Sequence, residues 1–208
     1  DFCLSRGLGD VYKRQVLHEI IQKIPYHPWP HHELVDFYIQ DGLLGKAIAE
    51  LGALTVIYLR NNQLRQAGAM VQRIGNIHAD VGDIEEAYIY LRRAMELVPG
   101  NIQLLNQLVD CCVQLGRTHD AVEYQMMIIQ RYLDTRELLK LVNALQRLIT
   151  IDRHNYAAYD LLGQTYQSVG EYEQAIEVYK RLAAVQSNNS TALERLAKLQ
   201  ELNARKIA

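Results

Sequence analysis

Hydrophobic residues recur every three or four positions through almost the whole chain, in segments separated by short turn sequences. The clearest example is the segment 156–189, in which two apolar stripes lie on either side of Gly170. The large and small residues of these stripes are Tyr159, Leu162, Gly163, Tyr166, Tyr172, Ala175, Tyr179 and Leu182. The pattern predicts two amphipathic helices joined by a glycine turn.

The order of large and small residues in this segment resembles the tetratricopeptide repeat, a helix pair with a period of about 34 residues. The resemblance implies that Gly163 and Ala175 are small because the paired helices approach each other closely there. The tyrosines of the segment would then fill the space around that contact. A single helix pair cannot bury its whole apolar face, so the resemblance also implies neighbouring repeats.

A turn glycine followed by an alanine five residues later marks the same register along the rest of the chain. The four pairs are Gly42 with Ala47, Gly82 with Ala87, Gly116 with Ala121, and Gly170 with Ala175. Successive glycines are 40, 34 and 54 residues apart, so two of the three steps exceed one repeat. The register predicts repeats at about 28–61, 68–101, 102–135 and 156–189.

The two long steps between the glycines require extra residues. The first step has six more than 34, and we assign them to 62–67 as an extension of the next first helix. The last step has twenty more, at 136–155, where Leu138, Leu141 and Leu145 share one stripe. These twenty residues predict a single extra helix or a collapsed repeat. Because an odd helix disturbs the alternation of a solenoid, we expect a change in curvature near 132–155.

Both ends of the chain differ from the repeats. The sequence "SRGLGDVYKRQ" resembles translated adapter sequence at the broken ends of metagenomic assemblies, so we expect 1–15 to be non-native. Residues 16–27 then indicate the second helix of a truncated repeat, in a bacterial fragment whose true N-terminus and targeting signals are missing. Residues 190–208 predict a capping helix, which solenoids need at their ends. Its inward-facing residues would be Leu193, Leu196 and Leu199.

These segments together predict an all-α fold, a right-handed superhelical solenoid of helix pairs over 28–208. Of the 208 residues, 49% are hydrophobic, and the formal net charge is −2. With 22 Lys and Arg against 24 Asp and Glu, the charge does not favour binding to nucleic-acid phosphates. The longest apolar runs are much shorter than the roughly 20 residues of a membrane-spanning helix. Three cysteines do not make a disulfide framework, and adjacent Cys111 and Cys112 are expected to be small core residues.

No phosphate loop, dinucleotide fingerprint, nucleophile elbow or metalloprotease motif is present, so we expect no enzyme activity and no cofactor. The nearest approach to a metal site is His27, His31 and His32. Pro28 and Pro30 interrupt any regular helix across these histidines, so we interpret the segment as a polar helix entry rather than a ligand set. We interpret His78 as a hydrogen-bonded structural residue.

The tetratricopeptide resemblance also implies where a partner would bind, because the first helix of each pair lines the concave groove of such proteins. The positions that match the groove and are expected to contact a partner are Asp36, Gln72, Arg73, Asn76, Asp80, Asn106, Gln107, Asp110, Asp160 and Gln164. Carboxamides both donate and accept hydrogen bonds, which suits an extended peptide backbone. Carboxylates outnumber Arg73 there, which favours a partner with basic residues.

The paired Lys, Asn and Arg residues of the carboxylate clamp in chaperone-binding members are absent from these positions. The sequence therefore predicts a non-catalytic scaffold that binds a protein or peptide in the groove, with no nucleic acid partner. Three alternatives stay open: a packing spacer with a solvated face, the C-terminal repeat region of a larger enzyme or signalling regulator, or a cell-envelope assembly factor of the pilus or secretion type. The sequence leaves the oligomeric state undetermined.

Overall fold

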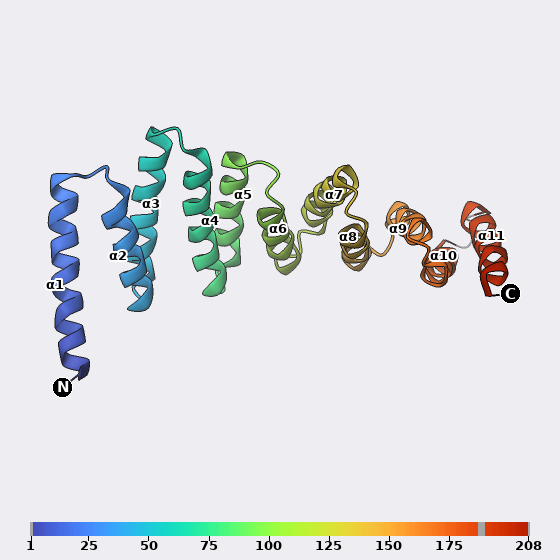
Figure 1. Ribbon diagram of the computed structural model, residues 1–208, viewed down its shortest axis with the longest axis horizontal. Coiled ribbons are helices and arrows are strands. Elements are labelled where there is room, and N and C mark those ends of the chain that lie inside the picture. Colours follow the sequence, from blue (N-terminus) through green and yellow to red (C-terminus); the bar gives the residue numbers. More distant parts are fainter. Residues whose placement is uncertain (1, 187–189, 208) are drawn as a thin grey trace. The chain divides into compact units, whose positions relative to one another are not determined.

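The computed structural model describes residues 2–186 and 190–207, and the burial of side chains at 12–186, 190–191 and 193–201. The described residues form eleven helices and no strand (Figure 1). The helices are α1 (Phe2–Lys23), α2 (Pro28–Gln40), α3 (Leu44–Arg60), α4 (Leu64–Asp80), α5 (Ile84–Leu97), α6 (Ile102–Gln114), α7 (Thr118–Thr135), α8 (Leu138–Ile151), α9 (Tyr156–Ser168), α10 (Tyr172–Val185) and α11 (Ser190–Ile207). The all-α fold is thus confirmed.

No helix in the described part is long and apolar enough to cross a membrane.

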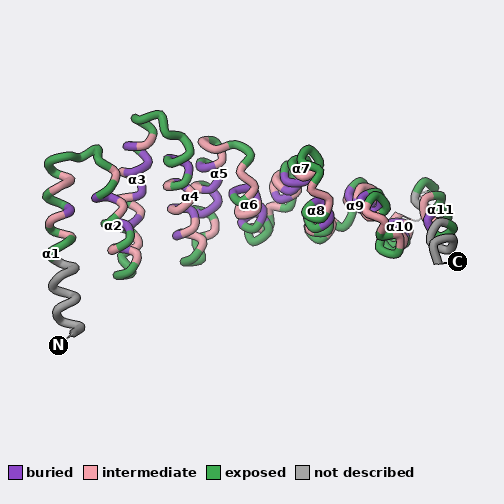
Figure 2. The backbone as a smooth tube through the Cα atoms, viewed as in Figure 1, coloured by how far each residue is buried: buried purple, intermediate pink, exposed green. Residues whose placement is uncertain are grey.

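The chain divides into two compact units, 1–111 and 112–208, with the boundary inside α6. In unit 1 each helix from α1 to α5 packs against the next one along the chain, and in unit 2 the same holds from α7 to α11. The buried positions lie on the helix sides that face these neighbours (Figure 2). Helix pairs stacked in sequence order are what the apolar stripes predicted.

Six tight turns within the units share one geometry. In each, one residue has a positive φ between 56° and 83°; these residues are Gly42, Asn62, Gly82, Gly116, Arg136 and Gly170. The next N–H donates back to a carbonyl five residues earlier, as from Leu43 to Tyr38 at 2.8 Å. This is the Schellman closure of a helix C-terminus, which satisfies carbonyls that the helix leaves open.

Two of these turns lack glycine, and the glycine register missed them. Asn62 divides the step of 40 residues into two of 20, and Arg136 divides the step of 54 into 20 and 34. The segment 62–67 is therefore not a helix extension throughout, because Asn62 is the turn residue and α4 begins at Leu64. Ala67 is fully buried, as are the alanines that follow the glycine turns. Helix α8 is the predicted extra helix.

The links after α5 and after α8 have a different geometry and start with a backbone near the β region, at Val98 and Asp152. Both end in an asparagine that caps the following helix. The Asn101 side chain accepts from Gln103 N at 2.9 Å, and the Asn155 side chain accepts from Ala158 N at 3.2 Å. An asparagine at this position satisfies amides that the first turn leaves open.

Close helix contacts explain the small residues of the repeat. A Cβ added at Gly163 would lie 2.6 Å from the Tyr179 ring, which confirms the close approach expected there. A Cβ at Gly75 would lie 2.9 Å from Leu91 in the pair α4 and α5. Because the side chains of Tyr179 and Leu91 are fully buried, they have no free space into which they could move to make room for a Cβ.

Most core positions are apolar, but one of six equivalent core positions, counted from the turn residues, holds a polar residue. The residues nine positions after the six turn residues are all buried, and they are Leu51, Val71, Leu91, Gln125, Leu145 and Tyr179. The Gln125 side chain donates to the Ala144 carbonyl of α8 at 2.8 Å, while its own oxygen is buried without a hydrogen-bond partner. The extra helix α8 is thus held by a polar contact where other pairs use an apolar one.

Two local expectations are corrected by the structure. Helix α2 begins at Pro28 and includes Pro30, because amides in the first turn of a helix have no intrahelical acceptor and proline costs little there. His31 and His32 therefore lie on a regular helix. In α11, Leu199 is buried as predicted, but Leu193 is 49% exposed and does not face inward.

Candidate functional site

Eight of the ten residues predicted to contact a partner belong to unit 1. They come from α2, α4 and α6, and we call them the first-helix surface: Asp36, Gln72, Arg73, Asn76, Asp80, Asn106, Gln107 and Asp110. The other two, Asp160 and Gln164, lie on α9 in unit 2.

Three amides of the first-helix surface form a hydrogen-bonded chain between α4 and α6. The Gln72 Nε2 donates to Gln107 Oε1 at 2.7 Å, and the Gln107 Nε2 donates to Asn76 Oδ1 at 2.7 Å. All three residues are half-buried. Because Gln72 and Asn76 lie one helical turn apart, Gln107 spans both. We call this chain the amide relay; it leaves the Gln72 oxygen and the Asn76 nitrogen at its two ends.

The only basic residue among the predicted contacts is engaged by an acid. Arg73 Nη2 on α4 lies 2.6 Å from Asp36 Oδ1 on α2, so these two charges largely neutralise each other. Nearby, the His32 ring nitrogen lies 2.7 Å from the Tyr58 hydroxyl. Burial, and then the positive charge of Arg73, lower the pKa of His32 below its ordinary value.

Asp80 and Asp110 are both solvent-accessible on this surface, and Asp80 has no ion pair among the described residues. The Asn106 amide donates to the Ile102 carbonyl of its own helix at 2.9 Å. The carboxylate surplus expected from the sequence is therefore smaller than a count of residues suggests, and it lies toward the C-terminal ends of α4 and α6.

Unit 2 has a cavity of about 390 Å³, and unit 1 has one of about 360 Å³. The cavity in unit 1 borders the amide relay. This cavity, of about 360 Å³, lies between α4, the link after α5 and the start of α6. It is lined by Arg65, Gly68, Ala69, Gln72, Val98, Pro99, Gly100, Asn101 and Leu104. Arg65 and the cavity were missed at the level of sequence, although Arg65 stands seven residues before Gln72 and hence on the same side of α4.

In unit 2 the predicted contact residue Asp160 is already engaged. Arg195 of α11 forms an ion pair with Asp160, and it also donates to the Tyr179 hydroxyl at 3.2 Å. Gln164 donates to the second Asp160 oxygen at 2.8 Å. Burial raises the pKa of Tyr179, so its hydroxyl stays protonated beside this cluster. Asp160 thus attaches α11 to α9.

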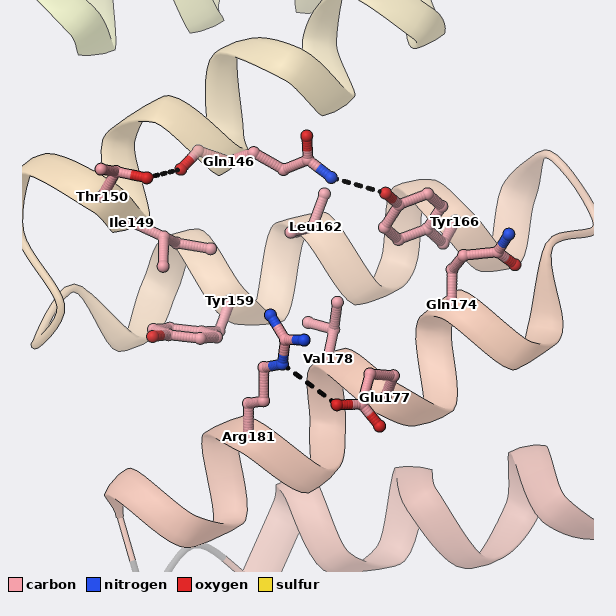
Figure 3. A pocket seen from close by; sticks show the side chains of 10 residues that line it. All are labelled: Gln146, Ile149, Thr150, Tyr159, Leu162, Tyr166, Gln174, Glu177, Val178 and Arg181. Atoms are coloured by element: carbon pink, nitrogen blue, oxygen red, sulfur yellow. Dashed lines mark hydrogen bonds and ion pairs between the residues drawn. The ribbon is translucent and has the colours of Figure 1, made fainter.

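One cavity of unit 2, of about 390 Å³, lies between α8, α9 and α10 (Figure 3). Apolar side chains such as Ile149, Leu162 and Val178 line it, together with two polar contacts. Gln146 donates to the Tyr166 hydroxyl at 2.8 Å, and Arg181 pairs with Glu177 at 3.1 Å. This cavity involves neither Asp160 nor Gln164, so it lies on a different side of α9 from those two residues.

The histidines of the segment 27–32 face separate partners and do not converge. His27 accepts from the Trp29 amide, and buried His31 contacts Glu50 at 2.6 Å and the Pro25 carbonyl at 3.3 Å. His78 stacks on Tyr90 at 5.3 Å between ring centroids. These contacts are structural. Within the described residues, His119, Asp120 and Glu123 could approach a metal ion together, but all lie at an accessible helix start.

Cys111 and Cys112 are buried and form no disulfide. Burial raises the pKa of the Cys111 thiol, which disfavours the reactive thiolate. These two residues thus have the environment of small core side chains.

The chain was compared with known proteins. The family description "Tetratricopeptide repeat" matches at 69–101 and at 158–191. No curated protein matches the chain. Solved structures that resemble it include MamA, at 19% identity and TM-score 0.39 over 84% of this chain and 81% of that one.

YrrB, described as a TPR protein with an unusual peptide-binding site, aligns at 16% identity and TM-score 0.40 over 86% of this chain and 96% of that one. The first TPR of Spaghetti (RPAP3), bound to an HSP90 peptide, aligns at 19% identity and TM-score 0.29 over 67% and 94%. The two family matches place tetratricopeptide repeats in both units.

Proposed function

We propose that this chain, a tetratricopeptide-repeat protein, is a non-catalytic scaffold that binds an extended segment of a partner protein on the first-helix surface of unit 1. The observation that carries the proposal is the amide relay, in which three half-buried carboxamides from two first helices are joined at 2.7 Å. Such an arrangement holds polar groups in place before a partner arrives, which lowers the entropy cost of binding.

The ends of the relay suit a peptide backbone. Gln72 presents a carbonyl oxygen and Asn76 presents an amide nitrogen, one helical turn apart. An extended peptide offers an N–H and a C=O from the same residue on one side of its backbone. One residue of a partner could therefore donate to Gln72 and accept from Asn76 without breaking the relay.

Charge favours a partner that carries basic residues. Arg73 is paired with Asp36, whereas exposed Asp80 on the same surface has no ion pair among the described residues. Carboxylates at the border of an interface raise association rates with positive partners and disfavour negative ones. Polyanions such as nucleic acids are therefore poor candidates.

The proposal is tested with a library of random seven-residue peptides displayed on phage. Selection on the intact chain should enrich peptides with Lys or Arg. The double variant Asp80→Lys and Asp110→Lys should lose that enrichment, because both carboxylates are replaced by like charges. Glu86→Lys, on exposed α5, serves as the matched control and should select the same peptides as the parent chain.

Gln107→Ala separates peptide binding from simple charge attraction. Loss of the central amide removes both 2.7 Å bonds, so every selected peptide should bind more weakly, by roughly fivefold to tenfold. If no peptide is enriched, or if Gln107→Ala has no effect, the first-helix surface is a solvated spacer face and not a binding site.

A further inference from the structure

Four polar residues and a cavity lie in line along one side of α4. Arg65, Gln72, Asn76 and Asp80 are seven, four and four residues apart, and this spacing places them on one stripe of a helix. The cavity of about 360 Å³ lies between Arg65 and Gln72 on the same stripe. From the N-terminal to the C-terminal end, α4 therefore presents a positive charge, a cavity with both apolar and polar lining residues, two amides and a negative charge.

The two charged ends are available to a partner. Arg65 and Asp80 are both exposed, and neither takes part in an ion pair among the residues that the structure describes. Arg73, in contrast, already pairs with Asp36. Asp110 of α6 lies three residues after Gln107, and so adds negative charge at the Asp80 end.

The length of this stripe defines the size of the partner segment. Fifteen residues separate Arg65 from Asp80, which corresponds to about 22 Å along a helix axis. An extended chain covers that length in about seven residues at roughly 3.3 Å each. One residue near the middle would then lie at the amide relay.

The relay also gives the segment a direction. The Gln72 oxygen accepts and the Asn76 nitrogen donates, so the bound residue has its N–H toward Arg65 and its C=O toward Asp80. The partner chain then runs parallel to α4, with its N-terminal part beside Arg65.

We propose that the partner segment is charge-polarised: an extended stretch of about seven residues with an acidic residue at its N-terminal end, beside Arg65, and a basic residue at its C-terminal end, beside Asp80. An apolar side chain that follows the acidic residue enters the cavity lined by Ala69, Val98 and Leu104. This inference rests on the proposed function and adds the order of charges to it.

The test compares three blocked seven-residue peptides by fluorescence anisotropy on the intact chain. The first peptide has Glu at its start and Lys at its end, the second has the reversed sequence, and the third has Lys at both ends. The first should bind about threefold to tenfold more tightly than the other two, as expected for two exposed ion pairs. The preference should shrink in high salt, because exposed charges are screened.

A charge-swapped variant makes the test independent of overall affinity. Arg65→Asp combined with Asp80→Lys should reverse the order of the first two peptides, because each end then attracts the opposite charge. Both residues are exposed, so the fold should be retained, and an unchanged melting temperature checks this. The matched control is Glu86→Lys with Arg93→Glu on α5, also exposed, which should leave the order unchanged.

Equal affinity for the first two peptides, or a swap that does not reverse their order, overturns the proposal. Tightest binding of the peptide with Lys at both ends also overturns it, yet leaves the proposed function standing with a simply basic partner. Failure of the library selection, in contrast, removes the proposed function itself.

Discussion

In unit 1 the first helices contact one another through side chains. In unit 2 the carboxylate Asp160 of α9 instead forms an ion pair with Arg195 of α11. Gln107 joins α6 to α4, and Asp36 joins α2 to α4, so these side chains connect successive first helices. Asp160 instead pairs with Arg195 and lies beside Tyr179. The repeat position ten residues before the turn glycine thus holds Gln72 of the amide relay in unit 1, and Asp160, which attaches α11, in unit 2.

The difference shows what decides the role of a repeat position. The resemblance to the tetratricopeptide repeat gives the side of the helix on which Asp160 and Asp80 lie. Whether the carboxylate is available depends on the next helix and on what charge that helix brings. A cation from α11 neutralises Asp160, while no described cation neutralises Asp80.

The largest expected effect concerns the matched core positions of the two units. Leu91→Gln in α5 should destabilise the chain by about 3 kcal/mol, because it buries an amide without partners. Gln125→Leu in α7 should be neutral or stabilising by about 1 kcal/mol, because it removes a buried oxygen that has no partner. Urea unfolding followed by circular dichroism measures both.

An equal loss of stability in these two variants would contradict the comparison, because it would mean that the bond from Gln125 to the Ala144 carbonyl is essential to α8. Gln125→Glu provides a further check. It keeps the shape of the side chain but loses the amide donor, so it should be the least stable of the three at neutral pH.

A smaller effect is expected from the attachment of α11. Arg195→Ala should cost about 1 kcal/mol or less, because the pair with Asp160 is about one-third exposed on both sides. Amide hydrogen exchange should become faster in α11 and stay unchanged in unit 1. Lys198→Ala, one turn along the same helix, is the control and should leave exchange in α11 close to that of the parent chain.

The smallest effect should appear in the pH dependence of unit 1. The pKa of His32 is lowered in the folded chain, so below its ordinary value of 6.5 the unfolded chain takes up the proton first. The contribution of His32 to folding stability is therefore fully present above pH 6.5 and is lost as the pH drops toward the pKa of His32 in the folded chain. His32→Gln should lose less stability between pH 7.5 and pH 5 than the parent chain, as measured by urea unfolding. An identical loss in both would exclude His32 as a contributor.

Much of the fold could be predicted because the relevant signals are local. Glycine at 42, 82, 116 and 170 provides the positive φ of a Schellman turn, and the apolar stripes give the buried side of each helix. The turns at Asn62 and Arg136 could not be predicted from glycine. Asparagine adopts a positive φ more readily than most residues, whereas arginine does not, yet both residues have a φ of 56°.

The sequence by itself determined that this chain is helical, that its helices pair, and which side of each first helix carries polar groups. Those properties follow from a spacing of three or four residues and from small residues at close contacts. Only the tertiary structure decided which polar groups are engaged with one another. The contacts of Gln107 with Gln72 and Asn76, of Asp36 with Arg73 and of Asp160 with Arg195 join residues 31 to 37 positions apart, so they depend on how successive helices stack.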